Sequence, residues 1–381
     1  MSAAATPWPL RQGKYVPSLP SGKYRSAAKS NNFPGFEELI MNAIDNVAAV
    51  QKQMVNTLLP LDAAEVLIRK GTPLSIAGPE AALDKLSQGN WIGGTSPYFM
   101  LAEGGVISDG DFVFVTDLSG VGTVSFASYD VQDLPGLSAN APDNAFAVTI
   151  MPSGSQVLKR FAADGADFVD AFLKPAVGWV AGVHLNDIGK VTAKVYDGRT
   201  GTKYEDRAVV AYVALPADRV ATIEIVNIFE PGSGDIITFD ATVFDVETCK
   251  VNGESTNFAA YVKARGLEHC KQPLIGDYAG GRINVSLQSV DSSAGNVALY
   301  APVFAGIEYR FARPVEDYAG LFRRRLAEQD TEGAVFACNC ILNFIFGDLE
   351  GKAIGGVAGP ITFGEIAYQL LNQTAVLVRV I

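Results

Sequence analysis

Residues 207–215 read RAVVAYVAL, and Ala208 to Leu215 form an uninterrupted run of eight apolar residues. Valine and tyrosine favour β-strands, so we interpret this run as a buried strand. It is one of five β-rich runs, which are separated by turn sequences such as Asp197-Gly198 and Pro231-Gly232. The runs span residues 177–185, 190–196, 207–215, 220–229 and 235–244. We expect one wide sheet to contain all five.

Further strands and helices flank this β-rich centre. On its N-terminal side the patterns predict a long amphipathic helix at 36–58, a strand at 65–69, a helix at 79–88, a hairpin of 111–116 with 122–128, a strand at 145–151 and a helix from 153 to about 173. On its C-terminal side they predict helices at 255–264, 315–326 and 341–346 and a final strand at 374–380. The fold class we expect is therefore mixed α/β, with mixed, largely antiparallel sheets covered by helices.

The length of 381 residues exceeds two average domains, and 48% hydrophobic residues suffice for a large core. We expect an N-terminal arm and amphipathic helix over 1–60, followed by two lobes over 61–224 and 225–381. No internal repeat is evident beyond Ile92-Gly93-Gly94 and Ile354-Gly355-Gly356, and chance explains so short a match.

Charge and cysteine content narrow the class of protein. Thirty Lys and Arg against 41 Asp and Glu give a net charge of −11, which disfavours binding to nucleic acid or to an anionic membrane surface. The longest apolar run is far shorter than the roughly 20 residues that span a bilayer. Four cysteines are too few for a disulfide framework, which indicates a reducing compartment. We therefore expect a cytoplasmic protein.

The usual catalytic signatures are missing. The sequence contains no G-x-S-x-G, H-E-x-x-H or C-x-x-C motif and no G-x-G-x-x-G after a strand. Its only histidines are His184 and His269, which limits imidazole chemistry. We accordingly assign no catalytic residue, no metal ligand and no cofactor.

Two cysteines in the C-terminal part leave alternatives open. Cys338 and Cys340 are two residues apart, so both thiols face one side if the chain is extended there. Because Phe336 and Ile341 surround them, a buried structural role is the main interpretation. A ligand-pocket wall and a reactive thiol are the alternatives.

A glycine-rich segment at 351–364 precedes Glu365. Glycines allow a ligand to approach backbone amides, and a carboxylate can hold an ammonium group, so an amino acid would suit both features. The alternative is a loop that merely turns the chain. Asn372 and Thr374 could add polar contacts, and an earlier loop at 92–95 supplies two further glycines.

Several of these segments together resemble FIST sensory domains. The resemblance rests on residues 334–338 (AVFAC), 359–366 (GPITFGEI), 372–374 (NQT), 225–239 (IVNIFEPGSGDIITF) and 91–95 (WIGGT), and it covers roughly residues 60–381. It implies an N-terminal and a C-terminal half of that family, at 61–224 and 225–381. It also implies a cytoplasmic signal-input module that binds small ligands such as amino acids.

The sequence thus predicts a stand-alone sensory module that binds a small molecule and acts through a protein partner or by forming a homo-oligomer. Its expected ligand-binding residues are Gly93, Gly94, Thr95, Cys338, Gly364, Glu365, Asn372 and Thr374. Two other functions stay open. One is an enzyme with Cys338 or Cys340 as nucleophile and His269 as base. The other is a ligand-free scaffold or oligomerisation module, which a second exposed apolar face on the helix at 36–58 would favour.

Overall fold

The computed structural model describes residues 56–278, 280–329, 331 and 333–381. The predicted helix at 36–58 therefore lies almost entirely outside the described residues, and its last residues belong to a strand. Within the described part the protein is mixed α/β, and three of its strand pairings are parallel while all others are antiparallel. The helices are few and short, and the longest has 10 residues. The predicted class is thus confirmed at this level, whereas the helical cover is smaller than expected.

The first part of the chain forms a β-α-β-α-β unit with a hairpin and a final strand. Its elements are β1 (Asn56–Pro60), α2 (Leu61–Arg69), β2 (Leu74–Gly78), α3 (Glu80–Leu83), β3 (Trp91–Thr95), the hairpin β4 (Tyr98–Leu101) and β5 (Gly104–Ile107), and β6 (Phe112–Asp117). The strands lie in the order β1-β6-β2-β3, with β2 parallel to β3. The strand predicted at 65–69 is wrong, because Ala64 and Ile68 are buried at the four-residue spacing of a helix.

The same succession of elements occurs twice more. The second unit contains β7 (Thr123–Tyr129), α4 (Gly136–Ala139), β8 (Ala145–Pro152), α5 (Gln156–Asp164), β9 (Ala176–Ala181), the hairpin β10 (Val195–Asp197) and β11 (Thr202–Tyr204), and β12 (Ala208–Ala214). The third contains β13 (Ala221–Asn227), α7 (Tyr318–Ala327), β23 (Ala334–Cys340), α8 (Ile341–Phe346), β24 (Gly359–Thr362), the hairpin β25 (Glu365–Ala367) and β26 (Gln369–Leu371), and β27 (Thr374–Val380). Their strand orders, β7-β12-β8-β9 and β13-β27-β23-β24, repeat that of the first unit. The body therefore consists of three structural repeats.

The hairpin of each repeat pairs with the sheet of another repeat. Hairpin β10–β11 of the second repeat pairs with β3 of the first, β25–β26 of the third pairs with β9 of the second, and β4–β5 of the first pairs with β24 of the third. This cyclic exchange completes three six-stranded sheets. The single wide sheet that we expected is therefore wrong. So is the hairpin of 111–116 with 122–128, because β6 and β7 belong to different sheets.

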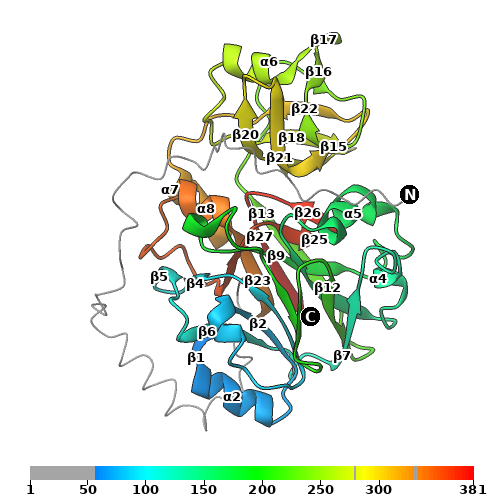
Figure 1. Cartoon of the computed structure of the whole chain (residues 1–381), viewed down its shortest axis with the longest axis vertical. Helices are drawn as coiled ribbons and strands as arrows, with labels where there is room; N and C mark the ends of the chain where they lie inside the picture. The colour runs from blue at the N-terminus through cyan, green and yellow to red at the C-terminus, as the bar shows by residue number, and fades with distance from the viewer. Residues whose placement is uncertain (1–55, 279, 330, 332) are drawn as a thin grey trace.

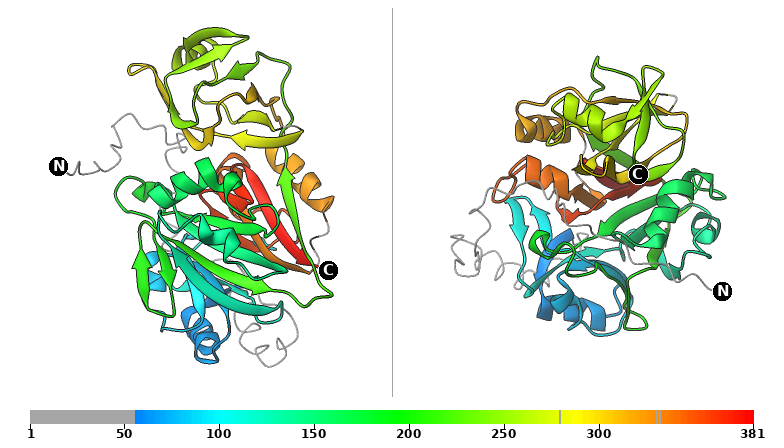
Figure 2. Two further views of the ribbon diagram at one scale, coloured as in Figure 1. Left: turned by 90° about the vertical axis from the view of Figure 1, so that its right-hand side faces the viewer. Right: turned by 45° about the horizontal axis from the view of Figure 1, so that its top comes forward.

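The three sheets enclose one apolar core, to which Ile92, Phe146 and Phe336 contribute from the first, second and third repeats. The short helices pack on the outer faces, as Figures 1 and 2 show. Ser155 caps the start of helix α5, because its hydroxyl accepts a hydrogen bond from the Leu158 amide, and the helix ends at Asp164. The predicted continuation to residue 173 is therefore wrong.

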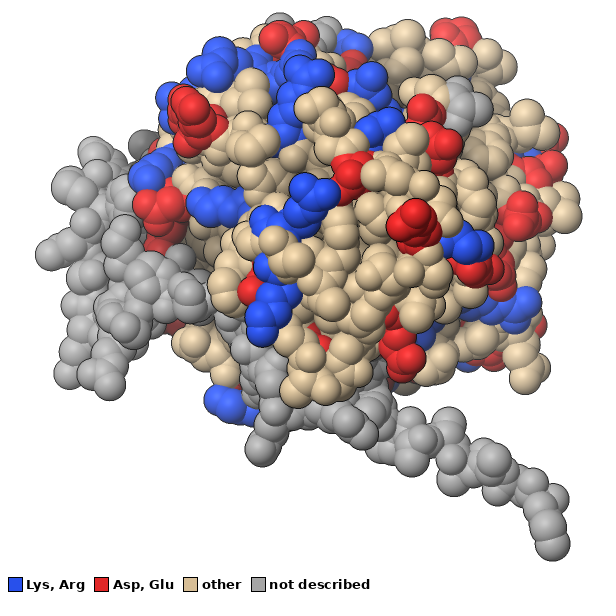
Figure 3. Space-filling view, turned by 90° about the horizontal axis from the view of Figure 1, so that it is seen from above, with Lys and Arg blue, Asp and Glu red and all other residues tan. Residues whose placement is uncertain are grey.

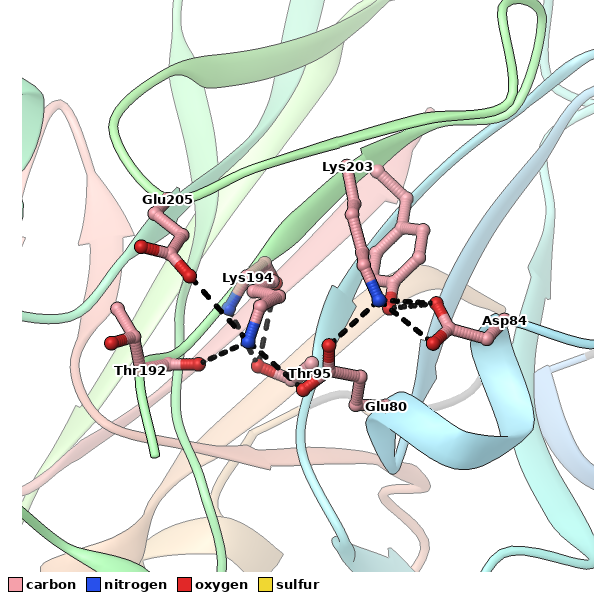
Figure 4. A network of polar contacts seen from close by, with 8 residues as sticks. Glu80, Asp84, Thr95, Thr192, Lys194, Lys203 and Glu205 are labelled. Carbon is pink, nitrogen blue, oxygen red and sulfur yellow. Dashed lines mark hydrogen bonds and ion pairs between the residues drawn. The ribbon is translucent and has the colours of Figure 1, made fainter. Parts of the chain in front are cut away.

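Ion pairs connect hairpin β10–β11 of the second repeat to the first repeat, with which it pairs. Lys203 Nζ, on β11, lies 2.7 Å from both Glu80 Oε1 and Asp84 Oδ2 at helix α3, and Lys194 Nζ lies 2.9 Å from Glu80 Oε2 (Figure 4). Several charges in one network stabilise more than isolated surface pairs do. The network therefore joins the second repeat to the first.

A smaller β unit is inserted between β13 and α7, and it stands at the top of Figure 1. It contains β14 (Ile237–Thr238), β15 (Val243–Val246), β16 (Thr248–Val251), β17 (Glu254–Asn257), α6 (Phe258–Ala264), β18 (Leu274–Tyr278), β19 (Gly281–Val285), β20 (Leu287–Asp291), β21 (Asn296–Val303) and β22 (Glu308–Phe311). The unit has its own core around Phe239, Phe258 and Tyr309. Its two connections to the body run side by side, because Pro231 and Ala312 form an antiparallel bridge. The division at 224/225 stays a prediction, and β13 runs across that position.

Candidate functional site

Glu365 is a fully buried carboxyl group at the first position of the exchanged hairpin β25–β26. The Thr374 hydroxyl donates a hydrogen bond of 2.8 Å to Glu365 Oε2, and the Cys340 thiol also hydrogen bonds to the carboxyl group. The first residues of the other two exchanged hairpins are Tyr98 and Val195, neither of which is acidic. The repeated fold therefore does not require a carboxyl group here.

The surroundings favour the neutral form of Glu365. Burial raises the pKa of this carboxyl group to about 8, although hydrogen bonds from Thr374 and Cys340 oppose the shift. The hydrogen bonds of the Thr362 hydroxyl also favour a protonated Glu365. This hydroxyl has one hydrogen, yet it lies 3.2 Å from Glu365 Oε1 and 3.3 Å from the Asn339 carbonyl oxygen. A protonated Glu365 resolves the conflict, because its O–H can donate to Thr362 while Thr362 donates to Asn339.

A chain of buried polar groups leads away from Glu365. The Thr374 carbonyl accepts a hydrogen bond of 3.1 Å from Asn343 Nδ2, and Asn343 Oδ1 accepts one of 2.7 Å from the Tyr318 hydroxyl. That hydroxyl in turn accepts one of 3.1 Å from Gln373 Nε2. All four side chains are buried, so the network is shielded from solvent. Helices α7 and α8 and the turn before β27 thus meet in one network.

Gln373 connects this network to the inserted β unit. Its Nε2 donates 2.9 Å to the Lys271 carbonyl oxygen, and its Oε1 accepts 2.7 Å from the Ser286 hydroxyl. Its backbone φ of 52° is unusual for a residue other than glycine, and such strained residues concentrate at functional sites. Gln373 therefore ties the inserted unit to the body.

A small recess opens where the two parts meet. Its interior of about 10 Å³ is close to the space that one water molecule needs. It is lined by Cys270, Lys271, Gln272, Ser286, Leu287 and Tyr300 of the inserted unit and by Leu342, Phe346 and Gln373 of the body. Lys271 Nζ donates 3.1 Å to the Phe346 carbonyl oxygen at its edge. The recess is one end of the hydrogen-bonded network, and Glu365 is the other.

The expected loop at 92–95 is a buried strand, β3. A Cβ atom at Gly94 would lie 2.7 Å from Ile150 and 2.8 Å from Trp179, so this glycine allows two sheets to pack closely. A Cβ atom at Gly93 would lie 2.8 Å from the Ile76 carbonyl oxygen. Thr95 accepts a hydrogen bond from the Lys194 amide. These residues do not line the recess, and packing explains both glycines.

The C-terminal candidates lie closer together. Thr374 contacts Glu365 directly, and Gly364 is the residue before Glu365 in the chain. Cys338 is fully buried, and its thiol donates 3.3 Å to the Gly178 carbonyl oxygen. Asn372 Oδ1 is buried without a hydrogen-bond partner in the described part of the chain. None of these side chains lines the recess, and a bound ammonium group could reach Glu365 only if the site opened.

The buried thiols argue against the cysteine-dependent enzyme. Burial raises the pKa of both Cys338 and Cys340 well above the usual value for a thiol, so the reactive thiolate is scarce near neutral pH. The proposed base, His269, is solvent-exposed, whereas both thiols are buried. The arrangement therefore gives neither thiol the activation that nucleophilic catalysis needs.

Sequence reasoning missed Tyr318, Asn343, Ser286 and the central place of Gln373. One signal was present, because Asn343 interrupts the apolar run ILNFIF at 341–346. A polar residue inside such a run is buried and must find partners. Tyr318 and Ser286 carry no comparable signal, since they reach the site from distant parts of the chain.

Within the described part of the chain, no three His, Cys, Asp or Glu side chains gather as metal ligands. The described helices include none that is both long and apolar enough to span a membrane.

Comparison with known proteins identifies a family. Neither the search of curated proteins nor that of solved structures gave a match. A family model described as a family of unknown function, DUF6976, matches residues 59–381, which include the inserted unit and all three repeats except the first three residues of β1. The chain therefore belongs to the DUF6976 family.

Proposed function

We propose that this protein is a cytoplasmic sensory module that binds a small ligand at the recess between the inserted β unit and the body. In this proposal it is a divergent relative of the FIST sensory domains, with lobes at 61–224 and 225–381, and it acts through a protein partner or as a homo-oligomer. The observation that carries the proposal is the position of Gln373. This one buried side chain touches the inserted unit, helix α7 and the recess.

The chemistry of the recess favours an amino acid or a related metabolite. Lys271 offers a positive charge for a carboxylate, while Gln373 and Ser286 offer oxygen atoms for an amino group. Leu287 and Leu342 offer apolar surface for a side chain. Ligand sites commonly combine apolar walls with a few polar groups and lie between structural units.

The ligand must widen the recess, because about 10 Å³ is too small for an amino acid. The inserted unit has its own core and is joined to the body by two adjacent connections, so it can move as a unit. Such movement would rearrange the hydrogen bonds of Gln373 and hence the network that ends at Glu365. This coupling supports a sensing role.

Replacing Gln373 with Ala should weaken ligand binding about tenfold or more. The variant loses the hydrogen bonds that the Gln373 side chain makes to the ligand in this proposal, which are worth about 1–1.5 kcal/mol each. Ligands are first found by a thermal-shift screen of amino acids, carboxylates and nucleotides. One at 100 times its Kd should stabilise the protein by about 2.7 kcal/mol. Affinities of the variants are then measured by calorimetry.

The matched control is Gln88→Ala, because Gln88 is an exposed glutamine that donates to the Thr200 carbonyl oxygen in the first repeat. A second variant, Lys271→Ala, alters an exposed side chain of the recess and guards against a folding defect in Gln373→Ala. Equal affinities of the wild type and both recess variants would exclude the recess as the binding site.

A further inference from the structure

Arginine side chains gather where the inserted unit joins the body. Residues 310–325 contain five arginines and two acidic residues, although the whole chain has 30 basic and 41 acidic residues. Arg282 on β19 lies beside them, because Arg282 and Arg325 both form ion pairs with Glu230, in the connection that leads from β13 to the inserted unit. We call the six residues the arginine surface: Arg282, Arg310, Arg313, Arg323, Arg324 and Arg325.

Nearby carboxyl groups do not neutralise this surface. Arg310 and Arg313 donate hydrogen bonds to backbone carbonyl oxygens of the same connection, and neither makes an ion pair with a described residue. Arg323 is exposed and has no ion-pair partner in the described part of the chain either. There, the ion-pair partners of the six arginines are three carboxyl groups, those of Glu230, Asp317 and Glu328. An excess of positive charge therefore remains.

The guanidinium groups are accessible to a partner. The side chains of Arg282, Arg324 and Arg325 are 51%, 64% and 40% exposed. Ion pairs between exposed groups stabilise a fold little, so a partner can compete for these arginines at small cost. Figure 3, which views the end that carries the inserted unit, shows Lys and Arg side chains gathered in its upper left part, whereas acidic and basic side chains alternate toward the right.

The repeated fold does not require these arginines. Helix α2 occupies the place of α7 in the first repeat, and its one basic residue, Arg69, lies 3.4 Å from Glu65 on the same helix. Helix α4, at the same place in the second repeat, has no basic residue. Three consecutive arginines are thus particular to α7, which points to a role outside the fold itself.

We propose that the arginine surface binds an acidic segment of a partner protein. Guanidinium groups bind carboxylates through paired, charge-assisted hydrogen bonds. A peptide can place its carboxylates so that they avoid Glu230, Asp317 and Glu328. A nucleic acid carries a negative charge on every nucleotide and would meet these three carboxyl groups at close range. The interspersed acidic residues therefore favour a peptide.

The arginine surface extends over both parts of the molecule. Arg282 belongs to the inserted unit, Arg313 to the connection between β22 and α7, and Arg323 to α7 of the body. A partner bound across them would hold the inserted unit and the body together. In the sensory module proposed above, which this last step presupposes, the partner would therefore respond to movement of the inserted unit.

Fluorescence anisotropy of a labelled deca-glutamate peptide, titrated with the full chain at low ionic strength, tests the proposal. We expect Arg313→Glu and Arg323→Glu each to raise the Kd about tenfold or more, because each variant replaces an attraction with a repulsion. The matched control is Arg219→Glu. It makes the same change in net charge at an exposed arginine that lies between β12 and β13 and has no ion pair with a described residue, and it should keep the wild-type Kd.

Arg323→Glu also guards against a folding defect in Arg313→Glu, which loses the 3.0 Å hydrogen bond from Arg313 Nε to the Pro231 carbonyl oxygen. Failure of the wild type to bind the peptide would overturn the proposal, and so would an equal loss of affinity in Arg219→Glu. A labelled single-stranded oligonucleotide that bound more tightly than the peptide, and more weakly to Arg313→Glu, would indicate a nucleic-acid surface and also overturn it. The titration needs no ligand at the recess, so its result is separate from that of the ligand screen.

Discussion

Glu365→Gln is expected to remove most of the loss of stability that the wild-type protein shows between about pH 4.5 and pH 8. The pKa of Glu365 is raised by burial from 4.5 to about 8, so in this range the folded state keeps a proton that the unfolded state has released. The free energy of unfolding therefore falls as pH rises through this range and levels off above the folded pKa. A shift of this size corresponds to a loss on the order of 5 kcal/mol.

Glutamine reproduces the neutral carboxyl group in shape and hydrogen bonding. Its NH₂ group can donate to Thr362, and its carbonyl oxygen can accept from Thr374. The variant should therefore match the wild type near pH 5 and exceed it by several kcal/mol near pH 9. Urea unfolding at a series of pH values measures this difference. The matched control Glu254→Gln changes an exposed glutamate and should keep the wild-type profile. A Glu365→Gln profile parallel to that of the wild type would show that Glu365 is ionised in the folded protein.

Gly94→Ala should destabilise the protein by about 3 kcal/mol, because the added methyl group would lie within 3 Å of Ile150 and Trp179 in the shared core. Neither neighbour can retreat easily, since both are buried between sheets of two repeats. Urea unfolding measures the effect. The matched control is Gly234→Ala, whose Cβ atom would meet nothing within 4 Å. If Gly94→Ala kept the stability of the wild type but bound the ligand more weakly, Gly94 would be part of the ligand site and the packing explanation would be wrong.

Local patterns predicted individual elements well. The strand at 145–151 and the terminal strand at 374–380 match β8 and β27, and the short helix at 341–346 is α8. Each of these is decided by neighbouring residues. Runs of β-branched residues favour strands, and helix α8 ends at Gly347, just before Asp348 adopts the left-handed conformation with a φ of 49°. Helix α7 was also expected, and it begins at Tyr318 because Asp317 caps it.

The arrangement of these elements could not be predicted in the same way. Tyr98, Val195 and Glu365 begin the three exchanged hairpins, yet they share neither size nor charge. Each needs to fit only its own surroundings, so the repeat leaves no sequence signature at these positions. Hairpin exchange adds to the difficulty, because β10 pairs with a strand about 100 residues away along the chain. Such pairing depends on the whole fold and not on local preference.

The candidate site was anticipated in part. Glu365 and Thr374 were both singled out, and they are in contact. The sequence suggested a charged carboxylate at Glu365, and the raised pKa that favours its neutral form was not anticipated. The shift is caused by burial, which is a property of the fold and not of the local sequence. The glycines at 93 and 94 suggested a loop, whereas close packing between sheets requires small residues in a strand.

Hydrogen–deuterium exchange of the full chain, measured with and without saturating pools of amino acids, carboxylates and nucleotides, tests the central claim most directly. A ligand held in the widened recess should contact both the inserted unit and the body and so slow local opening there. The account predicts slower exchange in peptides that cover residues 270–273, 286–287 and 372–374 with one class of ligand. Unchanged exchange in all three segments with every pool would contradict a ligand site at the recess.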